Sequence, residues 1–327
     1  MAFGGRAGYA PAGPMSERLL VLLSNDDGHT SPGIARMRAS LQAAGADVVV
    51  LAPENEQSAS SHALSLRRPL RLTSVGPGVF ALDGTPADCV YVALHAGTRV
   101  LPRWPDLVVS GINHGMNLGQ DAFYSGTVAA AREGALRGIP AVATSAHGAA
   151  DLQETAKLCV RIGLGLLEAL AAPDGAGVAA GKGVLLNVNV PKRWTGEVRA
   201  TRIGARIYEE VVDFRRDPRG REYLWLGGPG VRHERDAGTD TDAYDDGAVS
   251  ITPLVLDLTD TRQEAVTGPL AASLTSNPKL RKTVVTMDLT SSLSSITSMF
   301  FMANLHIRIR ANHCEHEEPR KTAQLTA

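Results

Sequence analysis

Short aliphatic runs separated by helical patterns recur along the first part of the chain. Residues 19–23 are all aliphatic and are bounded by polar residues, which predicts a strand buried on both faces of a parallel sheet. Comparable apolar runs occupy residues 48–52, 105–110, 141–144 and 183–190. Between the first two runs, Ile34, Met37 and Leu41 are spaced as on one face of a helix. The strand–helix–strand order predicts right-handed crossovers in an α/β fold, with a mostly parallel sheet and helices on both faces.

Further elements are indicated by capping signals and by a change of pattern late in the chain. Thr85, Pro86 and Asp88 fit the N-cap, first position and capping-box acid of a helix that runs to about residue 95. Beyond residue 198, aliphatic segments alternate with charged, glycine-rich loops, which predicts a smaller antiparallel C-terminal extension or oligomerisation arm. The other expected helices and strands are 128–137 and 151–171, and 67–74, 79–82, 198–212, 223–226 and 248–256.

A group of late acidic residues does not match a calcium site. These residues lack the ligand spacing and terminal glutamate of an EF-hand, so we expect them to form a solvated loop. They are Asp236, Asp240, Asp242, Asp245 and Asp246.

Composition and charge narrow the class of protein. The 327 residues are 44% hydrophobic, enough for a sizeable core, and the net charge of −1 gives no basic field to attract nucleic acid or a membrane surface. The three cysteines are odd in number and far apart, which favours a reducing, cytoplasmic environment over a disulfide framework. We expect Cys89 and Cys159 to fill the core.

The composition also divides the chain into expected parts. Residues 1–17 are rich in Gly, Ala and Pro without the apolar run of a signal peptide, and we expect a disordered leader. Residues 18–270 are expected to form the main α/β domain, with 198–256 as its hairpin or oligomerisation part, and 271–327 a tail of unknown role. No apolar stretch reaches the length of a membrane span; residues 298–309 come nearest but are short and charged. Residues 313–316 (His-Cys-Glu-His) do not complete a four-ligand zinc site.

The strongest chemical signal is the pair of acids that ends the first aliphatic run. Asp26, Asp27 and Gly28 follow the strand at its carboxyl end, where ligands bind in open α/β sheets. Because Gly28 favours a turn, both carboxylates can approach one point, where they repel unless a cation lies between them. Oxygen ligands suit Mg²⁺, Mn²⁺ or Ca²⁺. A solvated Asp-Asp-Gly turn explains the same three residues equally well.

Other segments are expected at the same edge of the sheet. The polar loop 54–61 follows the second strand and can supply a ligand hydroxyl, although serine-rich loops are common. Four glycines between residues 111 and 126 allow backbone N–H groups to approach a ligand closely. Ser125, Gly126 and Thr127 open a helix whose N-terminus can bind an anion, but a plain Ser/Thr N-cap accounts for them as well.

Several short motifs follow one another along the chain. They are Ser-Asn-Asp-Asp-Gly at 24–28, Ala-Pro at 52–53 before Gln-Ser at 57–58, Gly-Thr-Pro-Ala-Asp-Cys-Val at 84–90, Ser-Gly-Ile-Asn at 110–113, Tyr-Ser-Gly-Thr-Val-Ala-Ala-Ala at 124–131, Asp-Pro-Arg-Gly at 217–220 and Ser-Ile-Thr-Pro-Leu at 250–254. Together they resemble the SurE survival-protein family. The resemblance covers roughly residues 18–260, and several spaced motifs in the right order are stronger evidence than any one of them.

The resemblance implies a Rossmann-like fold and a metal-dependent phosphatase. Family members hydrolyse nucleoside 5′- and 3′-monophosphates, some also short polyphosphate, and form homodimers or homotetramers with exchanged C-terminal segments. By resemblance, one divalent cation per subunit, Mg²⁺ or Mn²⁺, would be held by Asp26, Asp27, Ser58 and Asn113. The phosphate pocket would be lined by Asn117, Ser125, Gly126 and Thr127. One catalytic acid, Asp26 or Asp27, would also take a proton from water.

Two other phosphate-handling classes compete with this 5′-nucleotidase interpretation. A haloacid-dehalogenase phosphatase needs Asp-x-Asp after its first strand, but the second acid's position is Gly28. A non-enzymatic receiver-like module also carries an acidic pair after strand one. Its phospho-acceptor position corresponds to Ser110 rather than an aspartate, and this serine lies too far along the chain. Phosphate release from a nucleotide separates an enzyme from a receiver.

Overall fold

The computed structural model describes residues 18–173, 183–208, 212–227 and 230–276. The expected leader 1–17, the apolar stretch 298–309 and residues 313–316 all lie outside these ranges. The chain divides into two compact units, Met1–Leu258 and Thr259–Ala327. In the second unit the structure describes a short 3₁₀ turn, η2 (Thr261–Gln263), and helix α8 (Glu264–Ser276).

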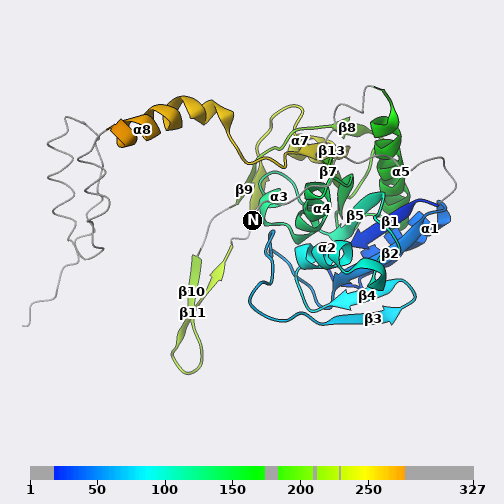
Figure 1. The fold of residues 1–327 in the computed structure, drawn as a ribbon. Helices are drawn as coiled ribbons and strands as arrows, with labels where there is room; N and C mark the ends of the chain where they lie inside the picture. The colour runs from blue at the N-terminus through cyan, green and yellow to red at the C-terminus, as the bar shows by residue number, and fades with distance from the viewer. Residues whose placement is uncertain (1–17, 174–182, 209–211, 228–229, 277–327) are drawn as a thin grey trace, which may run out of the picture. The chain divides into compact units, whose positions relative to one another are not determined.

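A nine-stranded sheet forms the centre of the first unit (Figure 1). Strand β1 (Leu20–Ser24) pairs in parallel with β2 (Asp47–Pro53) on one side and β5 (Leu107–His114) on the other. The full order is β3 (Leu72–Gly76), β4 (Val79–Leu82), β2, β1, β5, β6 (Ala141–Ala146), β7 (Leu185–Val190), β13 (Val249–Leu254) and β8 (Val198–Ala200). Only the β3–β4 and β7–β13 pairs of this sheet are antiparallel, so the prediction of a mostly parallel α/β sheet is confirmed.

Helices cover both faces of this sheet, as the aliphatic runs predict. On one face, Leu22 and Val108 pack with residues of α2 (Pro86–His95) and α4 (Gly126–Leu136). On the other, Leu23 packs with residues of α1 (Pro32–Ala43) and α5 (Leu152–Ala171) (Figure 1). Neighbouring strand residues point to opposite faces, so a strand buried on both faces is apolar throughout. The short α3 (Asp121–Tyr124) directly precedes α4.

The capping signals and the cysteines lie where the sequence places them. The Thr85 hydroxyl accepts from the Asp88 N–H at 3.1 Å, and Asp88 accepts from the Thr85 N–H at 3.0 Å. This is the expected capping box of α2. Cys89 and Cys159 are free thiols buried in the core.

Two predicted strands are wrong in extent. The segment 67–74 becomes extended only at Leu72, since Pro69 has no N–H for a sheet ladder. The single strand expected over 198–212 is interrupted: β8 ends at Ala200, β9 (Arg206–Tyr208) follows, and residues 209–211 lie outside the described ranges. β9 pairs with β12 (Val231–His233), while β10 (Val212–Arg216) pairs with β11 (Glu222–Leu226), both antiparallel.

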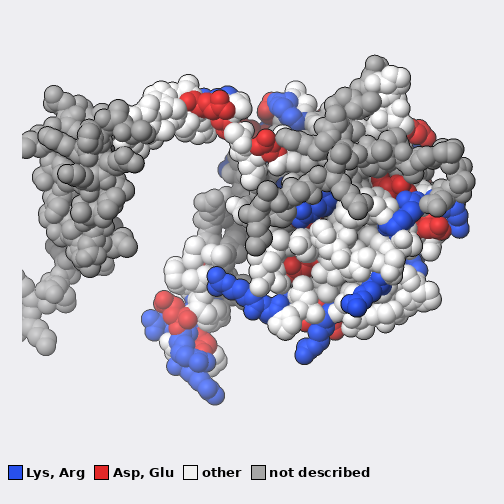
Figure 2. Space-filling model, in the orientation of Figure 1, with Lys and Arg blue, Asp and Glu red and all other residues white. Residues whose placement is uncertain are grey.

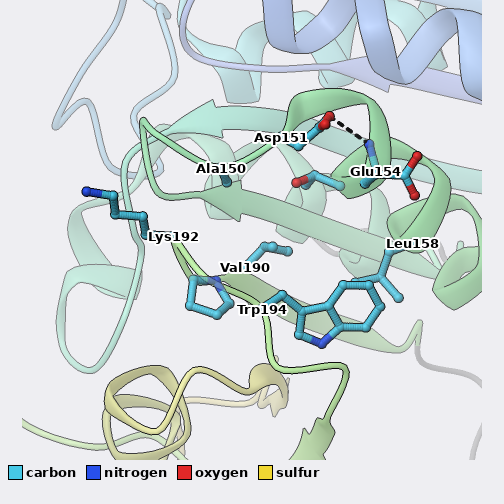
Figure 3. Close-up of a pocket in the computed structure, with 9 residues that line it drawn as sticks. Ala150, Asp151, Glu154, Leu158, Val190, Lys192 and Trp194 are labelled. Atoms are coloured by element: carbon cyan, nitrogen blue, oxygen red, sulfur yellow. Dashed lines mark hydrogen bonds between the residues drawn. The ribbon is translucent and has the colours of Figure 1, made fainter.

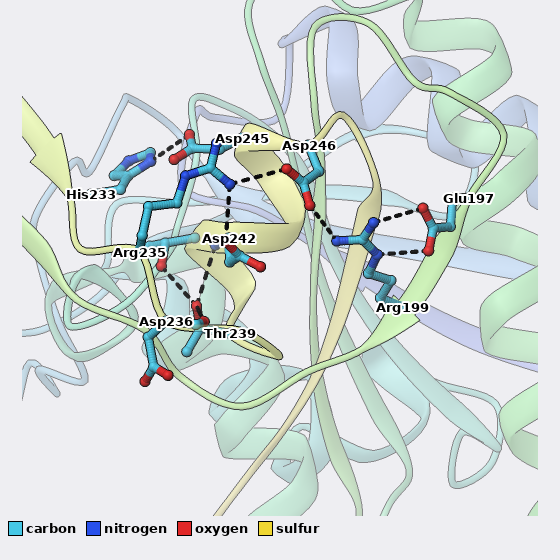
Figure 4. Close-up of polar contacts among 10 residues, drawn as sticks. Glu197, Arg199, His233, Arg235, Asp236, Thr239, Asp242, Asp245 and Asp246 are labelled. Carbon is cyan, nitrogen blue, oxygen red and sulfur yellow. Dashed lines mark hydrogen bonds and ion pairs between the residues drawn. The ribbon is translucent and has the colours of Figure 1, made fainter.

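The acidic segment near residue 240 is not a solvated loop, as we expected, but includes a helix. The Thr239 hydroxyl caps α7 (Asp240–Asp245), and Asp240 is fully buried. Its carboxylate accepts from the N–H groups of Gly119 at 2.9 Å and Gly204 at 2.7 Å, which explains its burial. Asp242, Asp245 and Asp246 pair with nearby basic side chains (Figure 4).

Surface charge agrees with the near-neutral composition. On the face shown in Figure 2, Lys and Arg side chains are interspersed with Asp and Glu among the coloured residues. Within the described ranges, no helix has both the length and the apolar character needed to cross a bilayer.

Two glycines in helices differ in how much space surrounds them, so substituting each by alanine should change stability in opposite directions. A Cβ at Gly33, in the first turn of α1, would lie 2.0 Å from the Ile112 carbonyl oxygen, whereas one at Gly165 in α5 would meet no atom within 4 Å. We expect Gly33→Ala to lower the free energy of unfolding by about 1–3 kcal/mol or more through overpacking. Gly165→Ala should raise it by about 0.5–1 kcal/mol. Urea unfolding measures both, and equal effects would contradict the close approach of α1 to β5.

Candidate active site

The acid pair lies at the carboxyl end of β1, beside the start of α4. Asp26 is buried, with 6% of its surface exposed, and its Oδ1 accepts a hydrogen bond from the Thr127 hydroxyl. Asp27 is half-buried, and its Oδ2 accepts from the His114 backbone N–H at 3.1 Å. The pair therefore links three segments that are far apart in the sequence: the ends of β1 and β5 and the first turn of α4.

Both carboxyl groups are held where ionisation is unfavourable. Burial raises the pKa of Asp26 from 3.8 to about 6; hydrogen bonds from Thr127 oppose this shift, and the charge of Asp27 adds to it. Burial also raises the pKa of Asp27. The hydrogen bond from the His114 N–H lowers this pKa, and the negative charge of Glu56 raises it further. Among the described residues, neither acid forms a salt bridge with Lys or Arg. Within the described ranges the pair thus presents negative charge that no Lys or Arg side chain offsets, although the charge of His114 lowers the pKa of Asp27.

The loop after β2 lies against the acid pair. We call residues 57–62 the serine loop. The Gln57 N–H donates to the Asp26 carbonyl oxygen at 2.8 Å, which fixes the start of the loop beside the acids. Ser58 is exposed, and its hydroxyl donates to Glu56 Oε1 at 2.6 Å. Ser58 therefore follows directly after the residue that contacts Asp26, but its own hydroxyl is bonded to Glu56, just before the loop.

Sequence reasoning missed Ser60. Its hydroxyl oxygen is buried and has no hydrogen-bond partner among the described residues. A Cβ at Gly126 would lie 2.8 Å from this oxygen and 2.9 Å from Asp26 Cβ, so only glycine lets the loop and the acid approach the helix start together. The sequence feature that could have indicated Ser60 is its position two residues after Ser58, in a loop expected at the same edge of the sheet as Asp26.

The end of β5 supplies the amide side chains. Asn113 is half-buried, and its Nδ2 donates to the Gly115 carbonyl at 2.9 Å. It directly precedes His114, whose N–H bonds to Asp27, so Asn113 reaches the neighbourhood of the pair. Asn117 is buried, and its Nδ2 donates to Ser145 Oγ at 2.8 Å. Its main chain is held by Asn189, which accepts from its N–H and donates to its carbonyl.

The start of α4 has the features of an anion site. Ser125 caps the helix, its Oγ accepting from the Val128 N–H at 3.1 Å. Gly126 and Thr127 follow in the first turn, where N–H groups lack intrahelical partners and the helix dipole is positive. Thr127 is fully buried and contacts Asp26. A group bound here would therefore lie next to the acid pair.

The donor chemistry fits a hard divalent cation. Within the described ranges, no three His, Cys, Asp or Glu side chains gather as a metal cluster, so a bound cation would meet two carboxylates and neutral oxygens. Magnesium and manganese accept such oxygen-only sets and keep positions open for water and phosphate. Uncompensated charge on Asp26 and Asp27 is the feature that a cation would relieve.

A pocket elsewhere lacks this chemistry (Figure 3). It holds about 120 Å³ between the start of α5 and the end of β7, beside Trp194 and Lys192. Its acids have structural partners: Asp151 caps α5, and Glu154 pairs with Lys157 at 2.8 Å. None of the candidate site residues lines it.

Known proteins similar to this chain share its fold and most of its length. Residues 21–210 match a family model described as Survival protein SurE. The 5′-nucleotidase SurE of Sorangium cellulosum is 61% identical over 261 residues, covering 80% of this chain and 99% of that protein. The 5′-nucleotidase SurE of Syntrophotalea carbinolica is 44% identical over 248 residues, covering 75% and 94%. The crystal structure of the SurE protein from Aquifex aeolicus matches with a TM-score of 0.64 and 37% identity, covering 77% of this chain and 99% of that chain.

The buried charge of Asp26 makes a prediction for the metal-free protein. Asp26 ionises near 3.8 in the unfolded chain and near 6 when folded, so stability falls as pH rises between these values. In EDTA above about pH 7, we expect Asp26→Asn to exceed wild type in free energy of unfolding by up to about 3 kcal/mol. The difference should vanish below the unfolded pKa. Urea unfolding across this pH range measures the difference. If the variant were no more stable than wild type above about pH 7, burial would not be the cause of the raised Asp26 pKa.

Proposed function

The chain belongs to the SurE survival-protein family, and we propose that it hydrolyses nucleoside 5′-monophosphates to nucleoside and phosphate with one divalent cation. The observation that carries this proposal is the contact between Thr127 and Asp26. This contact joins a carboxylate pair, suited to a cation, to a helix N-terminus, suited to an anion. A phosphomonoester complexed with a divalent cation needs both features side by side.

The cation would be held by oxygen atoms from three loops. We assign this role to Asp26, Asp27, Ser58 and Asn113, with Mg²⁺ or Mn²⁺ as the metal. Ser58 would have to turn its hydroxyl away from Glu56 to take part. When bound, the cation would polarise the phosphate and make water a better nucleophile.

The phosphate would be held at the start of α4. The N–H groups of Gly126 and Thr127 would donate to its oxygens and stabilise the charge that develops on them. Ser125 shapes this turn as the N-cap. We assign Asn117 to the same pocket; Ser145 and Asn189 hold its side chain and its main chain. Asp27 is the more exposed acid, and we assign to it the acceptance of a proton from the attacking water.

The receiver-like alternative meets a physical obstacle. In that interpretation Ser110 occupies the phospho-acceptor position. Its side chain is fully buried, beside Ser24 in the β1–β5 register. A phosphoryl donor cannot reach a hydroxyl inside the sheet without opening the core.

Phosphate release tests the proposal directly. We expect release from nucleoside 5′-monophosphates in Mg²⁺ or Mn²⁺ and none in EDTA. Asp27→Asn should lower kcat by about 100-fold or more, because both a ligand and a proton acceptor are lost. Asp47→Asn, an exposed acid at the opposite end of β2, is the matched control and should keep wild-type turnover. Full metal-dependent activity in Asp27→Asn would remove the assignment.

The same assay extends to the wider substrate range that the family resemblance implies. We include nucleoside 3′-monophosphates and short-chain polyphosphate in the proposal, because the site recognises a terminal phosphate and the metal. Initial rates across these substrates measure this breadth, and no release from either class would restrict the enzyme to 5′-monophosphates.

We also propose that the protein is a homo-oligomer joined through its β10–β11 hairpin. In this two-stranded ribbon, Val212, Phe214, Leu224 and Leu226 share one face and are 48%, 61%, 47% and 79% exposed. Isolated hairpins are only marginally stable in water, so an apolar face of this kind needs a cover. A second copy of the chain supplies it.

Sedimentation velocity tests this interface. We expect wild type to sediment as a dimer or tetramer and the double variant Phe214→Lys, Leu224→Lys to sediment as a smaller species. Tyr223→Lys changes the opposite face of the ribbon and should leave the assembly intact. A monomeric wild type would overturn this part of the proposal.

A further inference from the structure

The serine loop adopts a backbone conformation that its own sequence does not favour. Ala59 and Ser61 have φ values of 57° and 50°, in the left-handed region. Residues other than glycine avoid this region because Cβ crowds the following carbonyl oxygen. Such a conformation persists only when surrounding contacts hold it. The loop's shape must therefore be imposed from outside.

Contacts at both ends impose this shape. At the start, the Gln57 N–H bonds to the Asp26 carbonyl. Farther on, the Ser61 N–H and hydroxyl donate to the carbonyls of Tyr124 at 3.0 Å and Phe123 at 2.8 Å. A contact between two side chains also joins the loop to α4: His62 Nε2 lies 2.9 Å from Glu133 Oε2.

Glu133 is a rigid acceptor for this contact. It lies on α4 with only 3% of its side chain exposed, two turns after Gly126. Burial raises the pKa of Glu133, but hydrogen bonds from His62 and Arg137 outweigh burial and lower it below its usual value. The two oxygens have separate partners: Oε2 meets His62, while Oε1 accepts from Arg137 Nη2 at 2.8 Å. The loop can therefore lose its anchor while the Arg137 pair remains.

We propose that His62 and Glu133 are positioning residues that hold the serine loop on α4, so that Ser58 and Ser60 stay beside the acid pair. This inference rests on the proposed function, because it gives the loop its role at the metal site. The pair touches neither Asp26 nor Asp27 and acts through the backbone between residues 58 and 62. Its removal should weaken cation binding while the sheet and α4 remain folded.

Three variants separate this role from general stability. His62→Ala removes the hydrogen bond, and His62→Gln keeps an N–H donor for Glu133. Arg137→Gln breaks the other pair of the same carboxylate, together with the contact of Arg137 over the Tyr91 ring, and leaves His62 in place. Amide hydrogen exchange of Gln57 and Ser61, measured without metal, reports loop order. Isothermal titration with Mn²⁺ alone reports cation binding, and phosphate release from a nucleoside 5′-monophosphate reports turnover.

In His62→Ala, we expect the Ser61 amide hydrogen to exchange at least about tenfold faster than in wild type. We also expect Mn²⁺ to bind about 10- to 100-fold more weakly, which is the usual effect of removing a residue that orients metal ligands. His62→Gln should recover most of both effects, and Arg137→Gln should match wild type in both. The inference would be overturned if His62→Ala showed the same amide exchange rate and the same Mn²⁺ affinity as wild type. Equal losses in His62→Ala and Arg137→Gln would also overturn it.

The exchange measurement also separates this inference from the proposed function. A wild-type protein that releases no phosphate, but whose loop loosens in His62→Ala, would refute the nucleotidase proposal and leave the anchor standing. An active wild type whose His62→Ala variant keeps its loop and its Mn²⁺ affinity would refute the anchor alone.

Discussion

Two adjacent carboxylates, Asp26 and Asp27, follow the carboxyl end of strand β1, and their unfavourable charge is the constraint on which the candidate site depends. Burial opposes the ionisation of each, and among the described residues no Lys or Arg pairs with either. The described residues supply neutral hydrogen-bond donors, among them the Thr127 hydroxyl to Asp26 and the His114 backbone N–H to Asp27. An arrangement that satisfies hydrogen bonds but leaves the charge uncompensated keeps affinity for a cation, at a cost in stability.

The parallel sheet makes this arrangement possible. β2, β1 and β5 are neighbours with the same direction, so the segments that leave their carboxyl ends meet at one edge. The serine loop follows β2, the acid pair follows β1, and Asn113 is the second-last residue of β5. Helix α4 starts at the same edge, where Gly126 allows Ser60 and Asp26 to approach together. The cation site and the phosphate site that we propose would thus lie next to each other.

The C-terminal part of the first unit braces this edge. Asp240 in α7 accepts from Gly119, which lies two residues after Asn117, and from Gly204 before β9. Asn189 in β7 holds the main chain of Asn117 from the other direction. The main chain at Asn117 and Gly119 is therefore held by segments that follow it by 70 residues or more along the chain. Changes in the C-terminal part should be transmitted to the site through these contacts.

The sequence by itself determined the sheet, its covering helices and the capping box of Thr85 and Asp88, because hydrophobic periodicity and capping act within a few residues. It also indicated which loops lie at the site, since strand ends in a parallel sheet share an edge. Only the tertiary structure decided what depends on distant partners. Asp240 is buried because two amides far away in sequence need its carboxylate, and Ser60 reaches the site because Gly126 leaves room for it. The left-handed backbone at Ala59 and Ser61 carries no local sequence signal, since contacts with Tyr124 and Glu133 impose it from outside.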